Sequence, residues 1–83
     1  MYEIINEPIE VICAYLKDRV LPICFRWQNS KYTVDKVNLV HSARSGSDKL
    51  YFYSVSQRSN YFKLYFNSAS NKWQLVDAYL SLA

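Results

Sequence analysis

Glycine, proline, cysteine and histidine are all scarce in this 83-residue chain, which has one glycine, two prolines, two cysteines and one histidine. A single glycine excludes a glycine-rich loop of the kind that cradles phosphate groups. Cys13 and Cys24 form no CxxC pair and have no histidine cluster beside them, which excludes a zinc site. We therefore expect no metal or other cofactor, and we interpret the cysteines as buried, reduced thiols, with a strand-to-strand disulfide as the alternative.

Long apolar runs are missing as well. The N-terminus carries acids where a secretory signal would carry Lys or Arg, and Glu7, Pro8 and Glu10 interrupt the first apolar stretch long before membrane length. We therefore predict a cytoplasmic protein that does not associate with a membrane. Residues 1 to 18 contain four acids and one lysine, whereas residues 19 to 83 contain nine bases and three acids. These bases are scattered singly, so an anionic partner is permitted but not required.

The residue patterns of catalysis are absent too. His41 is the only histidine. With Ser42 as a nucleophile and Asp35 as an orienting acid, it could be the base of a catalytic triad. Neighbours on an extended chain point to opposite faces, however, so we interpret His41 as a solvated loop histidine. Because four of the seven acids crowd the first eighteen residues, paired carboxylates for acid and base chemistry are not evident. We predict that the protein is not an enzyme.

Aromatic residues, at 17 %, are what the chain has in quantity, and they can fill the small core of one domain of 83 residues. They are densest in residues 61 to 80, where two alternating runs flank a polar turn, Asn67 to Asn71, and so predict a β-hairpin. Because side chains alternate along a strand, residues 61 to 66 have two different faces. We predict that Phe62, Leu64 and Phe66 point inward and that Tyr61, Lys63 and Tyr65 point outward.

The first third of the chain is less regular. Residues 1 to 7 show no pattern, and we expect a loose lead-in. Residues 8 to 16 alternate and are rich in β-branched side chains, which favours a strand. A short helix from Pro8 to Arg19 is the open alternative, because its apolar residues also fit a period of 3.6. Residues 17 to 22 then form a connection, since Pro22 lacks the N–H that a central strand needs.

A second hairpin follows. Residues 23 to 28 alternate with Ile23, Phe25 and Trp27 on one face, Asn29 and Ser30 form a tight turn, and a return strand begins at Lys31. The inward phase then slips between Val34 and Val37, which indicates a β-bulge that bends a long strand around the core. Residues 40 to 48, which contain Gly46, lose the alternation, and we predict the longest and most mobile loop there.

Residues 50 to 56 form a strong strand whose two faces compete for the core. We favour Tyr51, Tyr53 and Val55 as the inward set, which places Phe52 outward, where an exposed Phe beside Tyr61 and Tyr65 makes an apolar patch. Residues 57 to 60 turn the chain into the last hairpin. Altogether about six strands joined by short turns predict a single all-β domain over residues 1 to 83. Its architecture is an antiparallel meander that is strongly bent or closes partly into a barrel.

This outward face carries the functional hypotheses. Single-stranded nucleic acids bind sheets that present aromatic rings to their bases, with Lys or Arg nearby for their phosphates. The candidate binding residues with that composition are Tyr61, Lys63, Tyr65 and Phe52, with Arg26, Arg58 and Lys31 at strand ends. We predict a binding or accessory module with a single-stranded nucleic acid or a protein as partner. The alternative is that the same tyrosines pack against a second copy, which makes the face a homodimer interface.

Three segments also suggest a family. They are Glu-Pro-Ile-Glu-Val at residues 7 to 11, Phe-Arg-Trp at 25 to 27 followed by Tyr32, Val34 and Val37, and Tyr-Phe-Lys-Leu at 61 to 64 with Trp-Gln-Leu at 73 to 75. Together they resemble a group of small bacterial domains of unknown function that occur alone and beside or fused to Y-family translesion polymerases. Similar domains carry a Gly-Arg type turn where this chain has residues 29 to 31. The resemblance implies a DNA-repair neighbourhood and supplies no catalytic residues.

Overall fold

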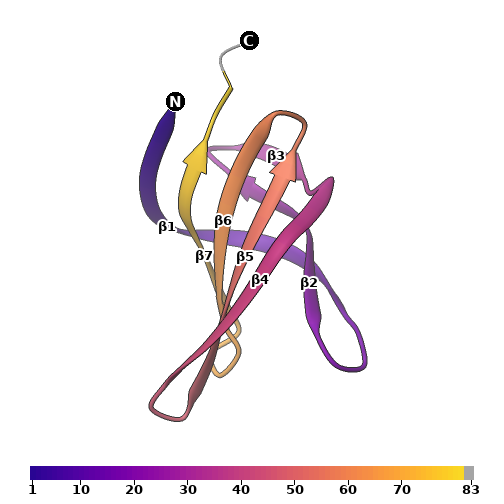
Figure 1. Ribbon diagram of the computed structural model, residues 1–83, viewed down its shortest axis with the longest axis vertical. Helices are drawn as coiled ribbons and strands as arrows, with labels where there is room; N and C mark the ends of the chain where they lie inside the picture. Colours follow the sequence, from indigo (N-terminus) through magenta and orange to yellow (C-terminus); the bar gives the residue numbers. More distant parts are fainter. Residues whose placement is uncertain (82–83) are drawn as a thin grey trace.

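The computed structural model describes residues 1 to 81, which form seven β-strands and no helix (Figure 1). The strands are β1 (Tyr2–Tyr15), β2 (Val20–Trp27), β3 (Ser30–Thr33), β4 (Lys36–Ser45), β5 (Asp48–Gln57), β6 (Asn60–Asn67) and β7 (Lys72–Tyr79). All pairings are antiparallel and all seven strands belong to one curled sheet, so the predicted all-β bent meander is confirmed with one strand more than expected. The first segment is a strand, which excludes the helical alternative for residues 8 to 19.

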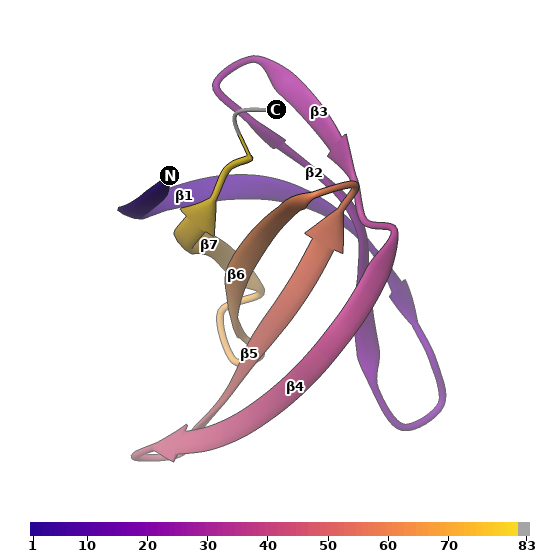
Figure 2. The same cartoon turned by 45° about the horizontal axis from the view of Figure 1, so that its top comes forward.

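Strand order shows how the sheet curls. The order is β3-β2-β1-β7-β6-β5-β4, so strands that are consecutive in the chain are paired except β3 and β4, which lie at opposite edges. Two backbone hydrogen bonds bring these edges together at one corner, because Val34 N–H donates to Ile23 C=O at 2.9 Å and Asp35 N–H donates to Ser56 C=O at 2.9 Å. The backbone is therefore hydrogen-bonded to β2 at Val34 and to β5 at the next residue, Asp35. Beyond this corner β4 and the β1–β2 hairpin diverge in both views (Figures 1 and 2).

The hydrophobic core fills the inner side of this curl. Phe66 stacks on Trp73 with ring centroids 4.5 Å apart, and Phe25 meets the edge of Phe62 at 5.1 Å, which joins β2 to β6 across the interior. The inward sets predicted for residues 51 to 55 and 62 to 66 are confirmed, since Tyr53, Val55, Phe62, Leu64 and Phe66 are all buried and Tyr51 packs against them. The buried cluster consists of Phe25, Trp27, Tyr53, Val55, Phe62, Leu64, Phe66, Trp73, Leu75 and Ala78.

The predicted loose lead-in over residues 1 to 7 is wrong, because β1 begins at Tyr2 and pairs with β7. Its register shifts between Ile4 and Glu7, and Asn6 in that interval has a positive φ of 53°. Asn adopts this left-handed conformation more readily than most residues, and one extra residue on one strand makes a β-bulge. This bulge breaks the alternation that would have identified the strand.

Residues 20 to 22 also belong to a strand, β2, and not to a connection. Pro22 is tolerated there because β3 pairs only with Cys24 to Trp27, so only β1 lies beside this part of β2. The register of β1 with β2 shifts between Ile12 and Cys13, which leaves Ile23 as the extra residue. Ile23 is accordingly 46 % exposed and does not share the buried environment of Phe25 and Trp27, contrary to the predicted face.

The middle of the chain requires three corrections. The phase slip after Val34 is a strand break with a change of partner strand, not a bulge, although it does bend the chain around the core. The predicted loop over residues 40 to 48 is mostly β4 and the start of β5, joined by Gly46 and Ser47; only Gly46 has a positive φ, +61°, as a type II′ turn requires. The earlier tight turn is Gln28-Asn29, one residue before the predicted position, and both residues have positive φ as in a type I′ turn.

Cys13 and Cys24 are free thiols, as interpreted from the sequence; Cys24 is buried, whereas Cys13 is half-buried and not buried as expected. Among residues 1 to 81 there is no helix with the length and apolar character needed to cross a lipid bilayer.

Candidate functional site

The outer face of the sheet carries three rows of side chains that cross neighbouring strands. Side chains of directly paired residues lie on the same face, so the register defines each row. The tyrosine row consists of Tyr2, Tyr79 and Tyr61 on β1, β7 and β6. The charged row consists of Ile4, Asp77, Lys63, Ser54 and Leu39, and the ring row of Gln74, Tyr65, Phe52 and His41.

The tyrosine row is open to solvent. Tyr61, Tyr79 and Tyr2 are 53 %, 51 % and 58 % exposed, and the rings of Tyr61 and Tyr79 lie 6.5 Å apart between centroids. Tyrosine places an apolar ring and a polar hydroxyl on the same surface, which suits a partner that stacks. Only Tyr61 was predicted from the sequence. Tyr79 follows the period-two pattern of its strand, whereas Tyr2 lies in the segment whose bulge hides the strand.

The charged row holds the only ion pair among residues 1 to 81. Lys63 Nζ lies 4.0 Å from Asp77 Oδ2, and the Tyr2 hydroxyl donates a hydrogen bond of 3.0 Å to the same oxygen. This hydrogen bond to a carboxylate raises the pKa of Tyr2, with smaller contributions from burial and from the charge of Asp77. The Lys63 side chain is 47 % exposed, so the pair contributes little to stability and its ammonium group remains available to a ligand.

The ring row is more tightly packed. Phe52 and Tyr65 pair directly with ring centroids 5.3 Å apart, and His41 follows Phe52 at 6.2 Å. Phe52 points outward as predicted, but Tyr65 and His41 cover it and it is half-buried, not an exposed Phe. His41 is not a loop histidine, because it lies in β4, and its place in this row was missed by sequence reasoning.

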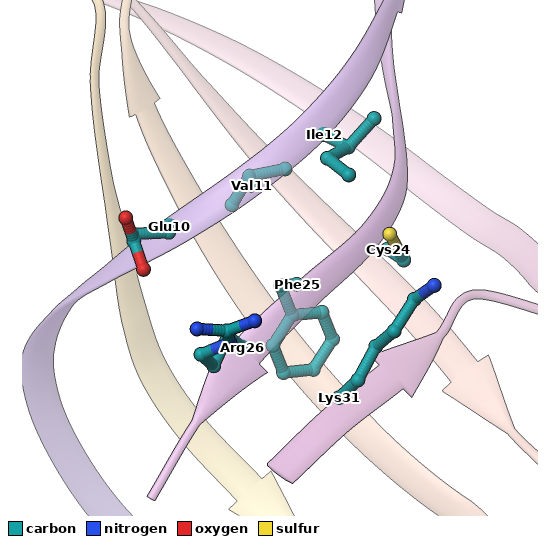
Figure 3. A pocket seen from close by; sticks show the side chains of 7 residues that line it. All are labelled: Glu10, Val11, Ile12, Cys24, Phe25, Arg26 and Lys31. Atoms are coloured by element: carbon teal, nitrogen blue, oxygen red, sulfur yellow. The ribbon is translucent and has the colours of Figure 1, made fainter. Parts of the chain in front are cut away.

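The basic candidates divide into two groups. Arg58 lies in the β5–β6 turn beside the tyrosine row, where its positive φ of 56° is held by a hydrogen bond of 2.6 Å from its N–H to Asp35 Oδ2. Arg26 and Lys31 are direct neighbours on β2 and β3, and β1 and β7 separate them from the candidate residues of β6 and β5. They line an open hollow of about 400 Å³, together with Glu10, Val11, Ile12, Cys24 and Phe25 (Figure 3). The structure therefore brings together Tyr61, Lys63, Tyr65, Phe52 and Arg58, and places Arg26 and Lys31 elsewhere.

The catalytic arrangement considered for His41 is not assembled. Ser42 pairs with Tyr51 of β5 and so faces the opposite side of the strand from His41. Asp35 lies at the corner, where its carboxylate accepts the Arg58 N–H. Within residues 1 to 81 no three His, Cys, Asp or Glu side chains are grouped closely enough to hold a metal ion. The three rows offer ring stacking, charge pairing and, at Ile4 and Leu39, apolar contact.

Comparison of the chain with protein-family models, with curated proteins and with solved structures gives no match. The resemblance to the small bacterial domains stays a prediction. Four positions that carry it, Phe25, Trp27, Trp73 and Leu75, are buried in the core. The residues that carry the resemblance therefore belong mainly to the core, and they give little information on what the outer face binds.

Proposed function

We propose that this protein is a non-enzymatic binding module whose outer face binds single-stranded nucleic acid, as an accessory to nucleic-acid transactions such as DNA repair. The observation that supports this most is the arrangement of two rows of aromatic rings with the Lys63 ammonium group between them. The resemblance to domains found beside translesion polymerases agrees with the proposal.

The spacing of the rows suits a strand of nucleotides. Tyr61 and Tyr65 are four residues apart on β6, which corresponds to about 13 Å along a strand. A single strand that stacks one base on each row must therefore cross the charged row, where Lys63 can meet a phosphate. Stacking on an aromatic side chain contributes about 1 to 3 kcal/mol for each base and tolerates any sequence.

The charge at the edges of this face also favours an anionic ligand. Lys36 lies opposite Ser56 at the β4 end of the tyrosine row, Lys72 lies opposite Asn67 beyond the ring row, and Arg58 lies in the adjacent turn. Three acids oppose these bases and Lys63: Asp77 lies at the centre of the face, Asp35 beside Arg58 and Asp48 beside Asn67, so four bases face three acids. Long-range attraction to a polyanion depends on the sum of these charges, which is positive.

A homodimer through the same face is the second candidate, and the apolar members of the charged row favour it. Ile4 and Leu39 are 72 % and 63 % exposed, the most exposed large apolar side chains of the three rows. Stacked bases do not need these aliphatic groups, whereas a protein surface would cover them. The two candidates therefore make different use of the same face.

One pair of measurements distinguishes the candidates. Sedimentation gives the oligomeric state, and a titration with a fluorescently labelled single-stranded oligonucleotide at two salt concentrations gives affinity and its salt dependence. A monomer that binds the single strand more tightly at low salt, and more tightly than the duplex of the same sequence, supports the first proposal. A dimer that binds neither supports the second. A monomer that binds neither overturns both.

A further inference from the structure

The side of β4 that faces away from β5 has no strand paired to it among residues 1 to 81. β4 has ten residues, pairs only with β5 and ends the sheet order, and eight of its ten residues are exposed. In Figure 2 it is the outermost strand on one side of the sheet, next to β5. An edge strand presents a row of unpaired N–H and C=O groups to which another extended chain can pair. The opposite edge, β3, has only four residues and offers much less.

The hydrogen bonds of the neighbouring strands identify which backbone groups are free. Lys49 C=O accepts a hydrogen bond from Ser68 N–H at 3.1 Å, so the backbone polar groups of Lys49 point toward β6 and away from β4. Arg44, which lies opposite Lys49, is therefore in a non-hydrogen-bonded pair. Because such pairs alternate along antiparallel strands, the N–H and C=O groups of Val40, Ser42 and Arg44 point away from β5 toward solvent.

This edge is weakly protected. Natural edge strands avoid unwanted pairing through proline, bulges or inward-pointing charges. β4 contains no proline, and its register shift lies between Val37 and Leu39. Its one inward-facing charge, Arg44, lies near the end of the strand, so Leu39 to Ala43 are in regular register with β5 and have no such protection. Leu39 and Val40 are 63 % and 46 % exposed on opposite faces of the strand, so an added strand would find an apolar side chain on each face.

The charge of the edge indicates the partner. β4 contains Lys36 and Arg44 and no acidic residue, and Lys49 lies directly opposite Arg44 on β5. Asp35 and Asp48 flank the strand, but their carboxylates accept hydrogen bonds from Arg58 and Asn67. A second copy of β4 would bring the same basic residues together with no carboxylate on either strand. An extended segment with acidic side chains would complete the backbone hydrogen bonds and neutralise the charges.

We propose that the free edge of β4 binds an extended acidic segment of another protein as an additional strand of the sheet. Main-chain hydrogen bonds from Val40, Ser42 and Arg44 supply affinity, and the basic side chains supply the preference for acids. This surface adjoins the outer face, because Leu39 and His41 of β4 end two of its rows, but it binds through the backbone edge and not through the stacking rings.

The test uses a capped peptide with alternating Glu and Val, and a matched peptide in which every Glu is replaced by Lys. We expect the acidic peptide to bind more tightly at low salt and to slow amide hydrogen exchange at Val40, Ser42 and Arg44 by about tenfold or more. The basic peptide should bind at least about tenfold more weakly. Absence of binding by the acidic peptide up to about 1 mM, or equal binding of both peptides, overturns the proposal.

Variants locate the site. Ser42→Pro removes an N–H from the free edge without removing a β4–β5 hydrogen bond, and it should weaken peptide binding by about tenfold, whereas Ser42→Ala should not. An acidic peptide N-methylated at every residue has no N–H donor on either edge, so it tests the same hydrogen bonds with the protein unchanged, and it should not bind. Retained binding by the N-methylated peptide, or a dimer in which exchange at these three amides is already slow, contradicts the proposal.

Discussion

The hydroxyl of Tyr53 donates a hydrogen bond of 2.6 Å to the backbone carbonyl of Val20, and so ties β5 to β2 across the inside of the sheet. Tyr53 is only 1 % exposed, and its ring also packs 5.4 Å from that of Trp73. β3 and β4 are the two edge strands of the sheet and do not pair with each other. β2 and β5 are the strands next to these edges, so this hydrogen bond holds the two sides of the curled sheet together.

Tyr53→Phe should destabilise the protein by about 1 kcal/mol at neutral pH, because it removes this hydrogen bond and leaves the Val20 carbonyl without its donor. Urea denaturation measures the change, which should appear in the midpoint and not in the slope. Tyr65→Phe, on the outer face, is the matched control and should change stability by much less. Equal effects of the two variants would mean that the Tyr53 hydroxyl is not a structural contact.

Alkaline pH should weaken the fold through the same residue. Burial, with smaller contributions from Tyr51 and Cys13, raises the pKa of Tyr53 to about 12 from 10.0. The folded state therefore holds this proton more tightly than the unfolded state, and the resulting stability is complete below pH 10 and decreases as pH rises toward 12. We expect the stability advantage of the wild type over Tyr53→Phe to narrow over that interval. An advantage that stays constant to about pH 12 contradicts this explanation.

The parts of the fold that could be predicted are those where one face of a strand is covered by the core. On β6, Phe62, Leu64 and Phe66 are buried while Tyr61 and Lys63 are exposed, so hydrophobic side chains recur with a period of two. Residues 40 to 45 of β4 could not be found in this way because most of them are exposed, and a strand without a covered face has no such pattern. β1 was hidden in part by its bulge at Asn6.

The candidate site was predictable only within one strand. Alternation places Tyr61, Lys63 and Tyr65 on one face, but it gives no information on which residues lie beside them. Tyr2 and Tyr79 join Tyr61 through the pairing of the first and last strands, which are far apart in the sequence. Such register is fixed by the packing of the whole sheet, so local pattern does not contain it.

Removal of either tryptophan side chain should destabilise the core strongly. Trp27 and Trp73 are 6 % and 8 % exposed, and Trp73 stacks on Phe66 while the Trp27 indole N–H donates to Glu7 Oε1 at 3.2 Å. Trp27→Ala and Trp73→Ala should each cost about 3 to 5 kcal/mol in free energy of unfolding. Thermal or urea denaturation measures this, with Tyr79→Ala as an exposed aromatic control. A loss below about 1 kcal/mol would contradict the burial of that indole.

Under the nucleic-acid proposal, the rings of β6 are needed for binding more than for folding. Tyr61→Ser and Tyr65→Ser together should weaken binding of a single-stranded oligonucleotide by about thirtyfold or more, since each lost stack removes about 1 to 3 kcal/mol. Tyr15→Ser removes a tyrosine that is more exposed, at 67 %, but lies outside the rows, and it should leave binding unchanged. A melting temperature that falls as far as in Trp73→Ala would show that these rings belong to the core and not to a binding surface.

The charge of Asp77 separates a nucleic-acid surface from a homodimer. Asp77→Asn keeps an oxygen that can accept the Tyr2 hydrogen bond but removes the negative charge beside Lys63. If phosphates cross the charged row, this change should raise affinity for a single strand about threefold, the effect of one charge at about 6 Å in water, and the gain should shrink as salt increases.

Asp18→Asn provides the matched control for that variant, because it changes the net charge equally but lies between β1 and β2, outside the three rows. Both variants strengthen the long-range attraction of the protein for the oligonucleotide. Only the additional affinity of Asp77→Asn over Asp18→Asn therefore shows that phosphates contact the charged row. If the face is a homodimer interface, no excess affinity of Asp77→Asn over Asp18→Asn is expected, because the second copy then covers the charged row and phosphates do not reach it. Equal affinities of the two variants would therefore place any bound nucleic acid away from Lys63.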